Sequence, residues 1–344
     1  MQYEEEHQLA VPDDNYVYMP GVGFVTPNPS NIERASIRRA SIVLGACFCL
    51  FYTFRTWIPQ MLLRLYVRVT GSGAFLYRND LFLESFHIIS HILIYCLPFI
   101  FYLRYVKMPK RVAIPLKKSN NFGISAGAVS ILLCIGMLGN TAGGMLTKVL
   151  GAWGFQTGGQ ALQIPSNPWG IALQIIDQVV ILVFLEEVLY RGLIMQSLRR
   201  YGDSFALIIS TLLFTGAYQN VFQFPAAFLI GLTCGYFVLK TGSLYTSIAM
   251  RFFERLAVYV LTVVSTYARP EYYTFVQRCF FVVIIIAALI SVSLMTNRNH
   301  NMFAVNSQAT NLRYRVKYKL FFTTFPMVAA VFVVLLGTWI GLKV

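Results

Sequence analysis

Charged residues are scarce in this sequence. Asp, Glu, Lys and Arg together make up 12% of its 344 residues, whereas soluble domains carry about 25%. Hydrophobic residues make up 57%, and apolar runs of about 20 residues, each long enough to cross a bilayer, recur along the chain. The composition therefore excludes a soluble domain and predicts an all-α fold, a polytopic transmembrane helix bundle of about eight or nine spans.

Several functional signatures are also missing. The phosphate-binding pattern Gly-x-x-x-x-Gly-Lys-Ser/Thr is absent, which argues against a nucleotide-driven motor. Only four histidines are present, and their positions do not allow a Ser-His-Asp set. The inverted repeats and paired broken spans of many secondary transporters are not evident. The function must therefore be sought in the polar residues inside the apolar runs.

The net charge of +14 has a membrane explanation. The Lys and Arg residues lie between the apolar runs, where they set the orientation of the spans and contact anionic lipid headgroups. We therefore expect the lipid bilayer as a partner, and no nucleic acid. The six cysteines fall within apolar runs and show neither disulfide nor zinc spacing, so we expect buried thiols.

The polar residues 1–39 predict a disordered cytosolic tail, and residues 40–344 predict one transmembrane bundle. The first span contains Arg55 and Pro59, so we expect it to be broken or short. The expected spans are 40–63, 82–103, 122–147, 169–198, 204–219, 224–239, 244–264, 273–295 and 320–341. A cytosolic N-terminus puts the strongly basic loops inside. We expect a multi-pass protein of a cell membrane, the plasma membrane of a bacterium.

Two adjacent carboxylates, Glu186 and Glu187, lie inside the apolar run that starts at Trp169. An ionisable residue in a membrane helix costs roughly 2.5–3.5 kcal/mol on insertion scales, so it usually faces the bundle interior and has a function. Glu187 and Arg191 are one helical turn apart and can pair on one face. Glu186 points about 100° away, towards whatever the site contains. The alternative is a structural ion pair that fixes a helix interface.

Three stretches share the order and spacing of known motifs. The segment 186–192, Glu-Glu-x-x-x-Arg-Gly, resembles the first motif of the CAAX-protease and bacteriocin-processing family of intramembrane proteases. The segment 214–218, Phe-Thr-Gly-Ala-Tyr, resembles the second motif, Phe-x-x-x-His. Thr-Gly-Ser-Leu at 241–244 resembles the lead into the third motif, His-x-x-x-Asn. The resemblance covers residues 170–260 and implies a CAAX-protease-like core. Members of the family cleave near the C-terminus of prenylated proteins or process peptides.

The sequence departs from the family at the positions that would hold a metal or a water. In the family, two histidines and an asparagine join the motif glutamate; here Tyr218, Arg251 and Arg255 stand at those positions. A phenol is a poor metal ligand at neutral pH, and a guanidinium offers no lone pair. We therefore expect an Arg–Glu cluster in place of a metal. The candidate residues of this degenerate catalytic site are Glu186, Glu187, Arg191, Tyr218, Arg251 and Arg255.

A second group of candidate ligands lies on the second expected span. Glu84, His87 and His91 share one face of a helix, and two histidines one turn apart can bind zinc. We expect no cofactor, with zinc at these three residues as the alternative. The competing interpretation is an interfacial glutamate and two histidines that bond within the bundle.

Three functions fit these observations. The favoured one is a degenerate homologue that binds a hydrophobic or prenylated peptide, or another membrane protein, in the former catalytic cavity. The first alternative is an active intramembrane endopeptidase in which Glu186 activates water, Arg251 stabilises the oxyanion and Tyr218 donates a hydrogen bond. The second alternative is transport of a small anionic or hydrophobic solute.

Overall fold

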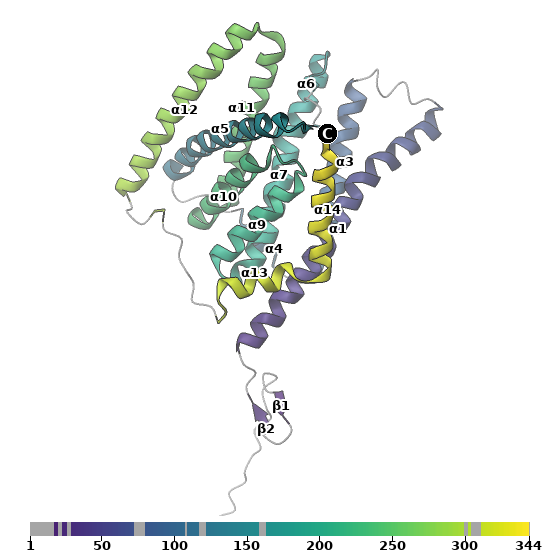
Figure 1. Ribbon diagram of the computed structural model, residues 1–344, viewed down its shortest axis with the longest axis vertical. Coiled ribbons are helices and arrows are strands. Elements are labelled where there is room, and N and C mark those ends of the chain that lie inside the picture. The colour runs from purple at the N-terminus through teal and green to yellow at the C-terminus, as the bar shows by residue number, and fades with distance from the viewer. Residues whose placement is uncertain are drawn as a thin grey trace, which may run out of the picture.

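The computed structural model describes residues 17–19, 23–25, 29–71, 80–106, 109–116, 122–157, 163–298, 302–303 and 311–343. Over these residues the chain is a helix bundle, which confirms the predicted all-α fold (Figure 1). Two short antiparallel strand pairs accompany the helices. They are β1 (Val17–Met19) with β2 (Gly23–Val25), and β3 (Gln156–Thr157) with β4 (Leu342–Lys343).

The first helix, α1 (Pro29–Thr70), begins earlier and runs longer than predicted. The expected boundary at residue 39 falls inside this helix, while residues 1–16 of the expected tail lie outside the described residues. Pro59 lies within α1, so the predicted break in this span is wrong. Membrane helices tolerate proline because neighbouring groups satisfy the freed backbone.

The next helices form one side of the bundle. They are α3 (Asp80–Val106), the short α4 (Lys110–Ala113) and α5 (Phe122–Ala152). α3 packs along α1, and α5 packs between α10 (Phe224–Thr241) and α12 (Pro270–Arg298). Gly139 of α5 makes the close approach to α10 feasible, because a Cβ at this position would overlap the backbone of Ala226.

The segment Pro168–Leu198, which carries the two glutamates, is a succession of helical turns of different pitch. α6 (Pro168–Ile175) is followed by the π-helical η1 (Ile176–Ile181), then α7 (Leu182–Glu187), η2 (Val188–Ile194, also π-helical) and α8 (Met195–Leu198). Single π-turns within helices occur frequently at functional sites. Here one lies on each side of the Glu186–Glu187 pair.

The remaining elements complete the bundle. A 3₁₀ turn, η3 (Arg199–Tyr201), leads to α9 (Asp203–Ala217), and α11 (Leu244–Tyr267) follows α10. The last two helices, α13 (Tyr314–Phe322) and α14 (Phe325–Gly341), meet at a bend of 77°. The predicted ninth span is therefore a bent pair.

Five described helices are long and apolar enough to cross a membrane, and the bent pair makes a sixth candidate. The other three predicted spans are helical but differ in ways that matter. The segment that starts at α6 is divided by π-turns, α9 has only 15 residues, and α11 carries Arg251, Glu254 and Arg255. Each predicted span therefore corresponds to a helical segment. The three segments that are not candidate membrane-crossing helices are those that carry or adjoin the predicted site residues.

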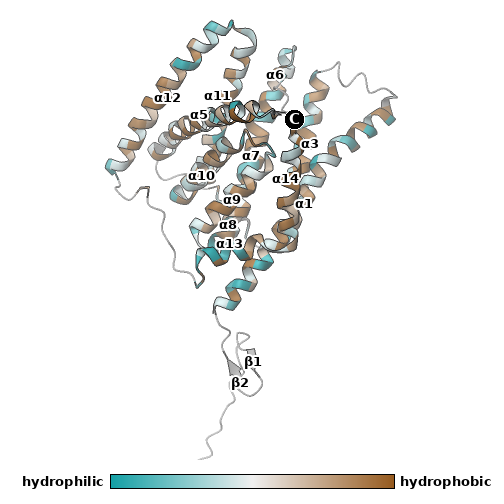
Figure 2. Cartoon of the chain, viewed as in Figure 1, coloured by the Kyte–Doolittle hydropathy of each residue, from teal (hydrophilic) through white to brown (hydrophobic). Residues whose placement is uncertain are grey.

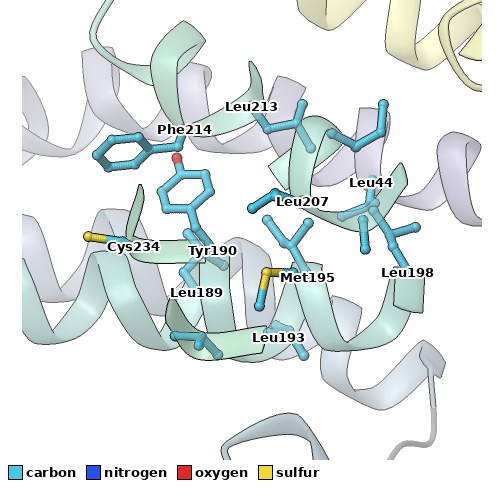
Figure 3. Close-up of a cluster of buried hydrophobic side chains, with 14 of the residues drawn as sticks. Leu44, Leu189, Tyr190, Leu193, Met195, Leu198, Leu207, Leu213, Phe214 and Cys234 are labelled. Atoms are coloured by element: carbon cyan, nitrogen blue, oxygen red, sulfur yellow. The ribbon is translucent and has the colours of Figure 1, made fainter. Parts of the chain in front are cut away.

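Apolar residues dominate the middle of the bundle, and hydrophilic residues gather at the lower end of α1 and on α13 (Figure 2). A buried hydrophobic cluster joins η2, α8, α9 and α10, with Tyr190, Phe214 and Cys234 among its members (Figure 3). Cys47 and Cys234 are buried as predicted, and Cys49, Cys96 and Cys134 are partly buried. Cys279 is exposed on α12, so the prediction of buried thiols is wrong for this residue.

Candidate functional site

The six predicted site residues come from four neighbouring parts of the bundle. α7 carries both glutamates, η2 carries Arg191, Tyr218 is the C-cap of α9, and α11 carries the other two arginines. Tyr218 and Arg255 are half-buried, and the other four are buried. The structure therefore brings together six residues that span the three motif segments.

Arg251 lies at the centre of this group. Its Nη2 donates to Oε2 of Glu186 at 2.7 Å, and its Nη1 donates to Oε2 of Glu254 at 2.6 Å. Its Nε lies 3.7 Å from Oε1 of Glu187. Only 1% of the Arg251 side chain is exposed. One guanidinium thus balances carboxylates from two helices inside the bundle.

Arg191 and Glu187 form the second half of the ionic cluster. Nη1 of Arg191 lies 3.1 Å from Oε1 of Glu187, which is the pair that the spacing predicts. Nη2 of Arg191 donates to the carbonyl of Gly231 at 3.2 Å, and the guanidinium carbon lies 4.3 Å from the centre of the Phe214 ring. Gly231 lets α10 approach α9, because a Cβ there would press against Phe214. This half of the cluster ties three helices together.

Tyr218 joins the ionic cluster to Arg255. Its hydroxyl accepts a hydrogen bond from Nη2 of Arg255 at 2.6 Å and a longer one from Nη2 of Arg251 at 3.2 Å. Tyr95 of α3 donates to Oε1 of Glu186 at 3.4 Å. The two carboxylate oxygens of Glu186 therefore have different partners. Oε1 accepts a hydrogen bond from the phenol of Tyr95, and Oε2 accepts one from Arg251.

A cavity of about 420 Å³ opens beside the ionic cluster. Its volume falls in the range of about 300–1,000 Å³ that is usual for small-ligand sites. Apolar side chains from α1, α3 and the segment around α7 form much of the wall. The polar residues that line it include Arg55, His91, Tyr95, Glu186, Tyr218 and Arg255. Glu186 is the one motif glutamate that faces this space.

The alternative zinc ligands do not converge. Nδ1 of His91 lies 2.9 Å from Oδ1 of Asp177, whereas His87 lies 3.7 Å from Glu84 on its own helix. Glu84 in turn accepts a hydrogen bond from Gln174 at 3.2 Å. Among the residues that the structure describes, no three His, Cys, Asp or Glu side chains form a group that could hold a metal ion. His91 therefore bonds to a neighbouring helical segment, whereas His87 is partly exposed beside Glu84.

Sequence reasoning missed Asp177, the residue that pairs with His91. Asp177 is fully buried in η1, and Gln178 donates to it at 2.9 Å. Tyr259 of α11 donates to Gln174 at 2.9 Å, which extends the same polar layer. Asp177 is an ionisable residue in the same apolar run as Glu186, so the criterion that selected the glutamates would have found it as well.

These features define a helical membrane protein with a buried ionic cluster beside a cavity. Residues 168–257 match the family model described as type II CAAX prenyl endopeptidase Rce1-like. The match confirms the predicted resemblance over 170–260, so this part of the helix bundle is similar to the CAAX prenyl endopeptidases. No curated protein and no solved structure matches the chain.

The residues at the family's ligand positions do not fit a metal ion. Arg251 stands at the second histidine position and already pairs with Glu186 at 2.7 Å. Tyr218, at the first histidine position, receives hydrogen bonds from two guanidinium groups. Because guanidinium groups are permanently positive, they would repel a divalent cation at this place. The chemistry of this site must therefore be argued without a metal.

Proposed function

We propose that this protein is a catalytically degenerate CAAX-protease-like protein that binds a hydrophobic or prenylated peptide, or another membrane protein, in its cavity. The observation that carries the proposal is the pairing of Arg251 with Glu186. A general base must be able to accept a proton from water. Glu186 instead accepts hydrogen bonds from a guanidinium and a phenol, so its charge serves to hold the helices together. The binding role requires no cofactor.

The cavity is suited to a ligand with an apolar part. Phe51, Phe86, Ile94 and Leu182 line it beside the polar residues. We propose that the protein lies in the plasma membrane of a bacterium with its N-terminus in the cytosol, where a ligand would enter the cavity from the bilayer. Several of the described helices are apolar enough to cross this bilayer.

The second candidate is an active endopeptidase, and one observation favours it. Glu186 lines the cavity together with Tyr218 and Arg255, so a peptide carbonyl could lie within reach of a carboxylate, a phenol and a guanidinium. Arginine and tyrosine can stabilise an oxyanion without a metal. In this mechanism Glu186 would take the proton of water, and the tyrosine would donate to the developing oxyanion.

One experiment separates the two candidates. Purified protein is incubated with a farnesylated peptide ending in a CAAX sequence, and both bound peptide and released tripeptide are measured by mass spectrometry. We expect binding without product for the wild type and for Glu186→Gln. A tripeptide released by the wild type and absent with Glu186→Gln would establish the endopeptidase. Solute flux into liposomes, without peptide binding, would instead favour transport.

A matched control reinstates the family pattern. The triple variant Tyr218→His, Arg251→His, Arg255→Asn restores the two histidines and the asparagine of the family motifs. If the scaffold still accepts a substrate, this variant gains slow hydrolysis that the wild type lacks. Hydrolysis by the triple variant alone would attribute the loss of activity to these three positions.

A further inference from the structure

Two arginines line the cavity from opposite helices, Arg55 of α1 and Arg255 of α11. Nη1 of Arg55 donates to the carbonyl of Ala217, and Nη2 of Arg255 donates to the hydroxyl of Tyr218. These acceptors belong to adjacent residues at the C-terminal end of α9. Both guanidinium groups therefore converge on one end of the cavity.

Neither arginine has a carboxylate counterion within ion-pair distance among the described residues. The acidic groups near the cavity lie beside other basic side chains, although Arg251 is shared by two carboxylates and Glu84 lies 3.7 Å from His87. The pairs are Glu186 and Glu254 with Arg251, Glu187 with Arg191, and Asp177 with His91. Arg55 and Arg255 are the basic residues that line the cavity and Glu186 is the acidic one, so the wall itself carries more positive than negative charge. Arg55 is exposed and Arg255 is half-buried, and ionisable residues that face a cavity inside a membrane bundle usually mark a functional site.

The arrangement of donors suits an oxyanion. The planar fork of a guanidinium matches the geometry of carboxylate and phosphate oxygens. Nε of Arg255 is buried and has no hydrogen-bond partner among the described residues. Tyr95 also lines the space, and its hydroxyl donates to Oε1 of Glu186. An acidic group at this end of the cavity would offset the excess positive charge of the wall.

We infer that the cavity binds the acidic headgroup of a membrane amphiphile, a phosphate or a carboxylate on an apolar chain, through Arg55 and Arg255. This inference rests on the proposed function, because it names the ligand of the same cavity. The headgroup lies at the end of α9, and the apolar chain lies along Phe51, Phe86 and Leu182.

The test compares three single-chain amphiphiles that differ only in the headgroup. Radiolabelled oleate carries a carboxylate, oleoyl lysophosphatidate carries a phosphate, and monooleoylglycerol is neutral. Binding to the full-length protein in a non-ionic detergent is measured for the wild type, Arg55→Gln and Arg255→Gln. Arg278→Gln is the matched control, because Arg278 is exposed on α12 and does not line the cavity.

We expect at least one acidic amphiphile to bind the wild type at least tenfold more tightly than monooleoylglycerol does. Each glutamine variant at Arg55 or Arg255 abolishes that preference, whereas Arg278→Gln retains it. The acidic amphiphile that binds more tightly, oleate or lysophosphatidate, shows whether the site prefers a carboxylate or a phosphate. Equal binding of acidic and neutral amphiphiles by the wild type, or an unchanged preference in Arg55→Gln and Arg255→Gln, overturns the inference.

Two further measurements keep the outcome interpretable. Thermal unfolding of each variant establishes that it is folded, and Arg55→Gln carries the test if Arg255→Gln does not fold. A farnesylated peptide with an amidated C-terminus, which has no acidic terminus, is titrated beside the amphiphiles. Binding of this peptide without any preference for acidic amphiphiles leaves the proposed function standing and refutes the inference. A preference for acidic amphiphiles without peptide binding supports the inference and refutes the proposed function.

Discussion

At the scale of single residues, Arg251 decides whether the site is a structural cluster or a catalytic centre. It is buried and contacts carboxylates on α7 and α11. Removing one partner of a buried ion pair typically costs about 3–5 kcal/mol, because the other charge is left uncompensated. We therefore expect Arg251→Ala to lower the free energy of unfolding by about that amount. Unfolding in detergent, followed by intrinsic fluorescence, measures the change. Arg278→Ala, on the exposed face of α12, provides the control.

A compensating variant distinguishes lost charge balance from lost packing. Arg251→Met fills space but leaves Glu186 and Glu254 without their cation. Adding Glu186→Gln and Glu254→Gln removes both charges, and we expect this triple variant to recover much of the lost stability. If Arg251→Ala proves as stable as the wild type, the arginine does not hold the cluster together.

His91 and Asp177 make a second prediction at this scale, about metal content. Because His91 bonds to Asp177 rather than meeting Glu84 and His87, we expect substantially less than one zinc per chain in the purified protein. Elemental analysis of the wild type, His91→Ala and Glu186→Gln measures this directly. We expect His91→Ala to alter stability without altering metal content. About one zinc per chain, lost in both variants, would restore the metalloprotease interpretation.

At the scale of elements, hydropathy and spacing predict the helices well, because each helix has its own apolar run. The same sequence reasoning predicts the Glu187–Arg191 pair, which depends only on the spacing within one helix. It fails where neighbouring helices decide the geometry. The π-turns of η1 and η2, the continuity of α1 through Pro59 and the 77° bend before α14 all depend on tertiary packing. Asp177 lies outside the motif segments, and its partner His91 comes from another helix, so spacing within one helix does not predict this pair.

Close packing of α5 on α10 gives a prediction with a control on the same helix. A methyl group at Gly139 would overlap the backbone of Ala226, whereas nothing lies within 4 Å of one at Gly144. Overpacking of this kind typically costs about 1–3 kcal/mol. We expect Gly139→Ala to lower the thermal unfolding midpoint. Gly144→Ala should leave it unchanged or raise it, because alanine favours the helix by about 0.5–1 kcal/mol. Equal midpoints for the two variants would contradict the close packing.

At the scale of the whole molecule, contacts between distant segments show which ends of the helices lie together. Lys317 of α13 is buried, lies 3.2 Å from Glu33 at the start of α1, and donates to the carbonyl of Tyr201 at 2.5 Å. The start of α1, the turn after α8 and α13 therefore share one end of the bundle (Figure 1). Strand β3, after α5, pairs with β4, after α14, so these two segments also lie together. The end of the bundle that holds the start of α1 and α13 is also the hydrophilic end in Figure 2.

This arrangement predicts the orientation of the protein in the membrane. If the N-terminus is cytosolic, the basic turn at Arg199 and Arg200 is cytosolic too, and the exposed Trp153 lies outside. Single cysteines are introduced as Trp153→Cys and Arg200→Cys in a variant without its six native cysteines. A membrane-impermeant maleimide applied to intact cells should label position 153 and leave position 200 unlabelled until the membrane is permeabilised. The reverse pattern would place the N-terminus outside. Labelling of both positions in intact cells would mean that the segment between them does not cross the membrane, and the cavity beside Glu186 would then not be reached from within the bilayer.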